Sequence, residues 1–124
     1  TDSILQKEKL MTSFYKTQLR DVLKGKVLQF SKKMGLSDFD WEIRKMKIRW
    51  GSCNQERRKV LFNLELSRVS ERYIDYVVVH ELTHLIERNH NNQFVSIMEK
   101  YLPNWRVLRD ELNATKLSNQ DWNE

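Results

Sequence analysis

Three histidines lie close together in this sequence, and their spacing suits a metal ion. The chain of 124 residues contains three histidines in all, His80, His84 and His90. His80 and His84 stand four positions apart in a segment of helical periodicity, so a helix would present both imidazoles on one face. Two imidazoles placed in this way can bind one zinc ion, and Glu81 beside them can take a proton from a water molecule that the metal activates.

His90 follows His84 by six positions, which is the ligand spacing of metalloproteases with the H-E-x-x-H-x-x-G-x-x-H pattern. That pattern has a glycine where this chain has Glu87. We therefore expect the chain to turn later, at Asn89, because asparagine tolerates the left-handed conformation that ends helices. Three protein ligands leave the fourth position of zinc to water, as in catalytic sites. The alternative is a closed structural site, for which Cys53 is the available fourth ligand.

Composition places the chain among ordinary soluble globular domains. Hydrophobic residues make up 40% and charged residues 31%, and a single cysteine excludes a disulfide framework. No apolar run approaches the roughly 18 residues of a membrane helix, so we expect no membrane partner. The length predicts one domain over residues 1–124. Because the chain begins with Thr1 instead of Met, we expect it to be either a processed protein or the C-terminal part of a longer one.

Positive charge is concentrated in one part of the chain. The net charge is +5, and residues 24–59 hold 11 basic and 4 acidic side chains. The basic segment 44–59 could attract a nucleic acid or a nucleotide. A solvated protein surface is the simpler explanation of the same charges.

Hydrophobic periodicity predicts an α+β fold. Helices are expected over residues 3–34, 71–88, 91–102 and 104–117. One or two strands are expected over residues 41–50, a turn-rich loop over residues 51–56 and a further strand over residues 60–69. Gly35 is placed to end the first helix, and Gly25 to kink or divide it. We expect several helices packed on a small antiparallel sheet, with the H-E-x-x-H sequence on the helix over 71–88. The strand at 60–66 is expected to lie along the cleft, where a peptide could add to it as a further strand.

Further motifs surround the histidines in a fixed order. They are Arg49-Trp50-Gly51-Ser52-Cys53, then Asn63, then Ile74-Asp75-Tyr76 leading to His80, and Asn89-His90 with Phe94. In this order they resemble the YgjP-like metallopeptidase family, which is related to SprT-like and WLM metalloproteases. The similarity runs from about Phe14 to Trp105. One departure is Val95, where the family often has tryptophan.

The resemblance implies a zincin-type catalytic domain in a cytoplasmic protein. It implies one Zn²⁺ per chain, held by His80, His84 and His90, with Glu81 as the general base or acid. Candidates for stabilising the oxyanion are Arg49, Tyr73 and Tyr101. Asn63 and Asp75 are candidates for orienting the imidazoles from behind. Asp75 lies five residues before His80 and points partly away from that face, so a capping or core-bonding role is the alternative for it.

The function expected from these residues is that of a zinc metallopeptidase, a hydrolase that cleaves peptides or proteins. One alternative is a zinc-dependent hydrolase of a non-peptide bond, such as a nucleotide phosphoanhydride held by the basic segment 44–59. Another is a DNA-associated metalloprotease-like module, which the same basic charges would favour.

Overall fold

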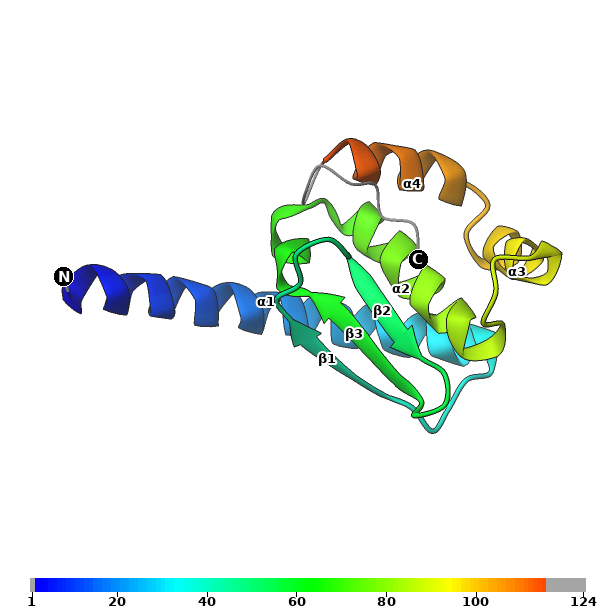
Figure 1. The fold of residues 1–124 in the computed structure, drawn as a ribbon, viewed down its shortest axis with the longest axis horizontal. Coiled ribbons are helices and arrows are strands. Elements are labelled where there is room, and N and C mark those ends of the chain that lie inside the picture. Colours follow the sequence, from blue (N-terminus) through cyan, green and yellow to red (C-terminus); the bar gives the residue numbers. More distant parts are fainter. Residues whose placement is uncertain (1, 116–124) are drawn as a thin grey trace.

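Four α-helices and a three-stranded sheet make up the fold in the computed structural model, which describes residues 2–115, and the helices leave one face of the sheet uncovered (Figure 1). The elements in chain order are α1 (Asp2–Met34), β1 (Asp40–Arg44), β2 (Gly51–Asn54), β3 (Lys59–Asn63), the 3-10 helix η1 (Leu64–Arg68), α2 (Glu71–Ile86), α3 (Asn92–Tyr101) and α4 (Trp105–Ala114). The α+β class predicted from the sequence is confirmed.

Helix α1, with 33 residues, extends beyond the rest of the fold. Its C-terminal half packs against α2 and η1 through buried Leu19, Leu23 and Val27, while its N-terminal half extends beyond the other elements (Figure 1). The helix continues through Gly25, so the predicted division there is wrong. Gly35 ends the helix as predicted: its φ is +69°, and the N–H of Leu36 donates to the carbonyl of Ser31 over 2.9 Å.

The sheet has the order β1-β3-β2 and is mixed. Strands β2 and β3 pair antiparallel, with Gly51 opposite Phe62. The antiparallel partner of β3 is therefore not the strand expected over residues 41–50 but the segment that follows it. Strand β1 pairs parallel with β3, so the prediction of a purely antiparallel sheet is wrong. The reason is topological, since β3 inserts between β1 and β2. Strand β3 is therefore paired on both sides, and the predicted addition of a peptide to the strand at 60–66 is wrong.

Asn63 explains why both predicted strands are shorter than expected. Its buried side-chain amide donates to the carbonyls of Met46 and Arg49, over 2.9 and 2.7 Å. Those carbonyls therefore bond to a side chain, and the segment between β1 and β2 is a loop. The Oδ1 atom of Asn63 accepts from the N–H of Glu65 over 3.0 Å, which starts η1 and ends β3.

Helix α2 is the central element and positions the histidines. It runs beside β2, with α1, α3 and α4 packed on its other sides (Figure 1). Eleven of its 16 residues are buried, including Val77, Val78 and Leu82 in the core. Helices α3 and α4 agree with the predictions to within a few residues, although positions 116 and 117 of the last predicted helix lie outside the described residues.

Among residues 2–115, no helix combines the length and the apolar composition needed to cross a membrane.

Candidate metal centre

The three histidines converge on one point at the C-terminal end of α2. The Nε2 atom of His84 lies 3.2 Å from Nε2 of His80 and 3.1 Å from Nε2 of His90. Three nitrogens bound at about 2.0–2.1 Å to one tetrahedral zinc would stand about 3.4 Å from one another. The spacing of the ring nitrogens therefore suits a zinc-sized ion.

The imidazoles are held in the neutral form that a metal requires. Burial lowers the pKa of His80 well below its usual value, and the nearby His84 and His90 lower it further. Burial, followed by the proximity of His90, lowers the pKa of His84 to about 4. The pKa of His90 is also lowered by burial. At neutral pH the three rings are therefore uncharged, and each has a nitrogen lone pair for a metal.

The turn that returns His90 to the site begins at Glu87. Helix α2 ends at Ile86, and Glu87 has extended backbone, with φ −131° and ψ 116°. The chain then bends over residues 88–91, which include Asn89 as predicted, but Asn89 does not take the left-handed conformation expected of it. Among the described non-glycine residues, positive φ occurs at Asp38 and Arg58. An extended residue directly after the helix changes the chain direction without a left-handed residue, which explains why glycine is not needed here.

Two groups behind the imidazoles orient them. The Glu87 carbonyl oxygen lies 3.3 Å from Nδ1 of His84, and the Tyr76 hydroxyl lies 3.4 Å from Nδ1 of His80. An N–H at Nδ1 that donates to such an oxygen leaves Nε2 free to bind a metal. Sequence reasoning missed Tyr76, although its position four residues before His80 puts it on the same face of the helix.

Phe94 forms an apolar floor under the site. Its ring centroid lies 5.3, 4.7 and 4.8 Å from those of His80, His84 and His90. Phe94 stands in the first turn of α3, and the side chain of Asn91 caps that turn by accepting from the Phe94 N–H over 3.0 Å. The start of α3 therefore fixes both the floor and the loop that carries His90.

Glu81 lies on the side of α2 that faces β2, and its side chain is fully buried. A Cβ atom added to Gly51 would stand 3.0 Å from both Cγ and Oε2 of Glu81. The carboxylate is therefore packed against the backbone of β2, one residue along the helix from His80.

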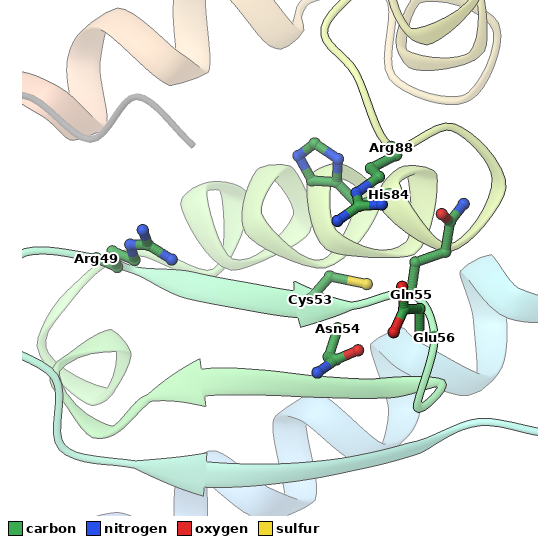
Figure 2. Close-up of a pocket in the computed structure, with 7 residues that line it drawn as sticks. All are labelled: Arg49, Cys53, Asn54, Gln55, Glu56, His84 and Arg88. Atoms are coloured by element: carbon green, nitrogen blue, oxygen red, sulfur yellow. The ribbon is translucent and has the colours of Figure 1, made fainter.

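A cavity of about 400 Å³ opens between β2 and the end of α2. Its lining residues are Arg49, Cys53, Asn54, Gln55, Glu56, His84 and Arg88 (Figure 2). Arg49 thus shares a cavity with one of the three histidines, as expected of a group that acts on the substrate. Cys53 lines the same cavity, but the group of potential metal ligands found among the described residues consists of His80, His84 and His90. The closed site with Cys53 as a fourth ligand is not supported.

The two tyrosines proposed for the oxyanion lie farther along their helices. Tyr73 precedes His80 by seven residues, about 10 Å along α2, and its hydroxyl accepts from Arg72 over 2.8 Å. Tyr101 ends α3 seven residues after Phe94, and Lys100 lies over its ring. Neither tyrosine lines the cavity that contains His84 and Arg49.

Asn63 and Asp75 make their hydrogen bonds with other segments and not with the imidazoles, which for Asp75 agrees with the alternative role expected of it. Both hydrogens of the Asn63 amide go to the carbonyls of the loop before β2. Asp75 accepts from Nζ of Lys26 over 2.6 Å, in an ion pair that joins α1 to α2. These side chains hold the elements around the site in place.

A helix that carries H-E-x-x-H beside the edge strand of a small mixed sheet, with a third histidine in the loop after it, defines a zincin-like metallopeptidase fold. Comparison with known proteins agrees with that class. The sequence profile of the YgjP-like family, metallopeptidase domain, matches residues 2–115. The chain therefore belongs to the YgjP-like family.

Two solved structures share the fold. The crystal structure of the metallopeptidase zymogen abylysin of Pyrococcus abyssi has a TM-score of 0.70 at 17% identity, covering 75% of this chain and 93% of that one. The metallopeptidase zymogen jannalysin of Methanocaldococcus jannaschii has a TM-score of 0.67 at 18% identity, covering 75% of this chain and 95% of that one. The comparison with curated proteins finds no match.

Proposed function

We propose that this protein is a zinc-dependent metallopeptidase in which Glu81 is the general base. The observation that carries the proposal is the convergence of three Nε2 atoms, with separations of 3.1 and 3.2 Å, on the helix that also carries the buried Glu81. Membership of a metallopeptidase family implies a hydrolase with a catalytic metal. Zinc and the cleavage of peptide bonds are the finer parts of the proposal.

His80, His84 and His90 would hold the metal through Nε2. A bound zinc ion would supply Lewis acidity and lower the pKa of a water molecule in the site. The Glu81 carboxylate takes a proton from the attacking water and delivers it to the nitrogen of the leaving amine. Burial of Glu81 and its packing against β2 hold the carboxylate in place for both transfers.

We further propose that the Arg49 guanidinium stabilises the oxyanion. Arg49 lines the cavity next to His84, whereas Tyr73 and Tyr101 do not. A guanidinium places fixed positive charge where negative charge develops on the carbonyl oxygen.

The edge strand β2 is the element proposed to bind the peptide. It lies at one end of the order β1-β3-β2, beside the helix that carries the histidines. An extended peptide could add to this edge by main-chain hydrogen bonds, which would hold it along the cavity.

Metal content and activity should be measured together on the wild type and on Glu81→Gln. We expect about one zinc per chain in both proteins, because Glu81 is not a proposed ligand. We expect cleavage of an unfolded protein such as casein to fall by about 10²–10⁴-fold in the variant. No bound zinc after attempted loading, or equal cleavage by both proteins, would contradict the proposal.

The second candidate function is hydrolysis of a nucleotide phosphoanhydride, favoured by the two arginines in the cavity. It predicts release of phosphate or pyrophosphate by the wild type and not by Glu81→Gln.

A DNA-associated role draws on the basic segment 44–59, but some of the positive charge of that segment is paired within the protein, since Arg44 and Lys59 pair with Glu42. Binding to DNA that weakens steeply with salt would support that role. The cytoplasmic location stays a prediction from the resemblance.

A further inference from the structure

Two guanidinium groups face the same cavity from different elements. Arg49 lies two residues before β2, and Arg88 lies in the loop after α2, next to His84 (Figure 2). Within residues 2–115, neither guanidinium has a hydrogen bond or an ion pair.

Two other arginines of the basic segment, Arg44 and Arg58, bond to groups within the protein. Arg58 donates to the carbonyls of Leu85 and Ser37, over 3.2 and 3.0 Å. Arg44 donates to the Glu42 carboxylate over 2.6 Å. The arginines at the cavity thus differ from these neighbours in having their donors available to a ligand.

The backbone under both cavity arginines is fixed to buried groups. The Arg49 carbonyl accepts from the fully buried Asn63 amide over 2.7 Å. Arg88 follows Glu87, whose N–H donates to the Thr83 carbonyl over 2.8 Å and whose own carbonyl lies 3.3 Å from Nδ1 of His84. Because these anchors belong to the metal centre and its supports, the backbone at each arginine is held at the cavity that His84 also lines.

We propose that this cavity is a subsite for a carboxylate of the substrate peptide, bound between Arg49 and Arg88. The inference rests on the proposed peptidase function and adds the class of substrate. Guanidinium groups bind carboxylates through parallel, charge-assisted hydrogen bonds, which neutral side chains cannot replace. The carboxylate comes from an Asp or Glu side chain near the cleaved bond or from the C-terminus of the peptide.

A carboxylate suits the cavity better than a polyphosphate does. Glu56 also lines the cavity, so the two arginines are opposed by one fixed negative charge. The glycine of this strand, Gly51, is paired with Phe62 in the sheet, and its backbone is not part of a phosphate-binding loop. A single carboxylate carries a charge that the arginines can balance.

The test compares peptides that differ in one charge. Quenched fluorescent peptides, blocked at both ends, carry Glu or Gln at each position flanking the cleaved bond. A third set has neutral side chains and a free C-terminal carboxylate. We expect the Glu peptide at one position, or the free-carboxylate peptide, to exceed its neutral counterpart by about 10-fold in kcat/KM. Which set shows the preference identifies the source of the carboxylate.

Arginine variants then assign the preference to the cavity. In Arg49→Gln and in Arg88→Gln we expect the ratio of acidic to neutral peptide to fall to about 1, and the Lys variants to retain part of it. The ratio is the readout, because Arg49 is also proposed to act on the oxyanion and its loss lowers the absolute rate. Arg57→Gln is the matched control: it removes the same charge from the turn between β2 and β3, outside the cavity lining.

Binding gives a readout that does not depend on turnover. Fluorescence anisotropy with the zinc-loaded Glu81→Gln protein should show the same preference for the acidic peptide, weakened by salt. Equal binding and equal cleavage of acidic and neutral peptides would overturn the inference while leaving the peptidase function intact. So would a preference that survives in both arginine variants. Tripolyphosphate that binds through both arginines, together with no preference among peptides, would also overturn it and favour a phosphate site. Failure to cleave any peptide or casein counts against the proposed function, and the binding preference is then judged by itself.

Discussion

Replacing Gly51 with alanine tests how closely β2 packs on the Glu81 side chain. The added Cβ would stand 3.0 Å from Cγ and from Oε2 of Glu81 and 3.1 Å from the Leu61 carbonyl oxygen. Attractive contacts between carbon atoms lie at about 3.5–4.0 Å, so these groups must separate by about half an ångström or more. Leu61 belongs to the central strand β3, which is paired on both sides. We therefore expect the Glu81 side chain to be displaced.

Both stability and catalysis should respond to this substitution. Forcing an extra methyl group into a packed interior costs about 1–3 kcal/mol of unfolding free energy. A catalytic group misplaced by about 1 Å can cost about 10²-fold in rate. We expect kcat to fall by about 10–100-fold with little change in KM. We expect zinc content to stay at the wild-type level, because the three atoms nearest to the added Cβ belong to Glu81 and Leu61 and not to the proposed ligands.

The assay measures kcat, KM, bound zinc and the midpoint of urea unfolding on the same preparations. Gly25→Ala is the matched control, because a Cβ at Gly25 has no neighbour within 4 Å in the described structure. That control should keep its activity and gain about 0.5–1 kcal/mol in stability, since alanine favours the helix. Gly51 lies in a strand without positive φ, so backbone strain does not contribute. Wild-type kcat and stability in Gly51→Ala would refute the proposed packing of Glu81.

Three further predictions concern the supports of the metal centre. Tyr76→Phe removes the hydroxyl that lies 3.4 Å from Nδ1 of His80 and should weaken zinc binding by about 10-fold, as measured by competition with a chelator. Unchanged zinc affinity would show that Tyr76 does not orient the imidazole of His80. Asn63→Ala removes three hydrogen bonds and should lower the free energy of unfolding by about 2–4 kcal/mol in urea titrations, whereas a change below about 1 kcal/mol would contradict its structural role. The metal-free protein should lose stability as the pH falls from 6.5 toward about 4, because the pKa of His84 is lowered to about 4 and the unfolded chain binds more protons in that window. The midpoint of urea unfolding, measured across this pH range, tests the direction of the change. The His84→Phe variant should show a weaker dependence of this midpoint on pH. A midpoint that rises on acidification would refute the prediction.

The chemistry of the site was predictable because most of it is local. His80, Glu81 and His84 lie within one helical turn and a half, and helix geometry alone places the two imidazoles on one face. Tyr76 lies four residues before His80, so the same helical spacing could have predicted its contact with that imidazole. The end of α1 was also predictable, since Gly35 adopts the positive φ that this residue type favours.

The course of the chain after α2 was only partly predictable. The number of residues between His84 and His90 indicated a return to the metal, but the position of the turn did not follow from residue preferences. Extended backbone at Glu87 is open to any residue, so no residue type marks it in the sequence. The carbonyl and N–H of Glu87 are instead fixed by their contacts with His84 and Thr83.

The sequence by itself determined the helix that carries His80 and His84, the spacing that brings in His90, the α+β class and the family. Only the tertiary structure decided which strand lies at the edge, which carbonyls Asn63 binds, and that Gly51 packs on Glu81 from a position thirty residues away in the chain. It also brought Arg49 and Arg88 to one cavity. The physical reason is the range of the interactions. Helical spacing acts over a few residues, whereas strand pairing and cavity lining depend on contacts between distant segments, which periodicity does not encode.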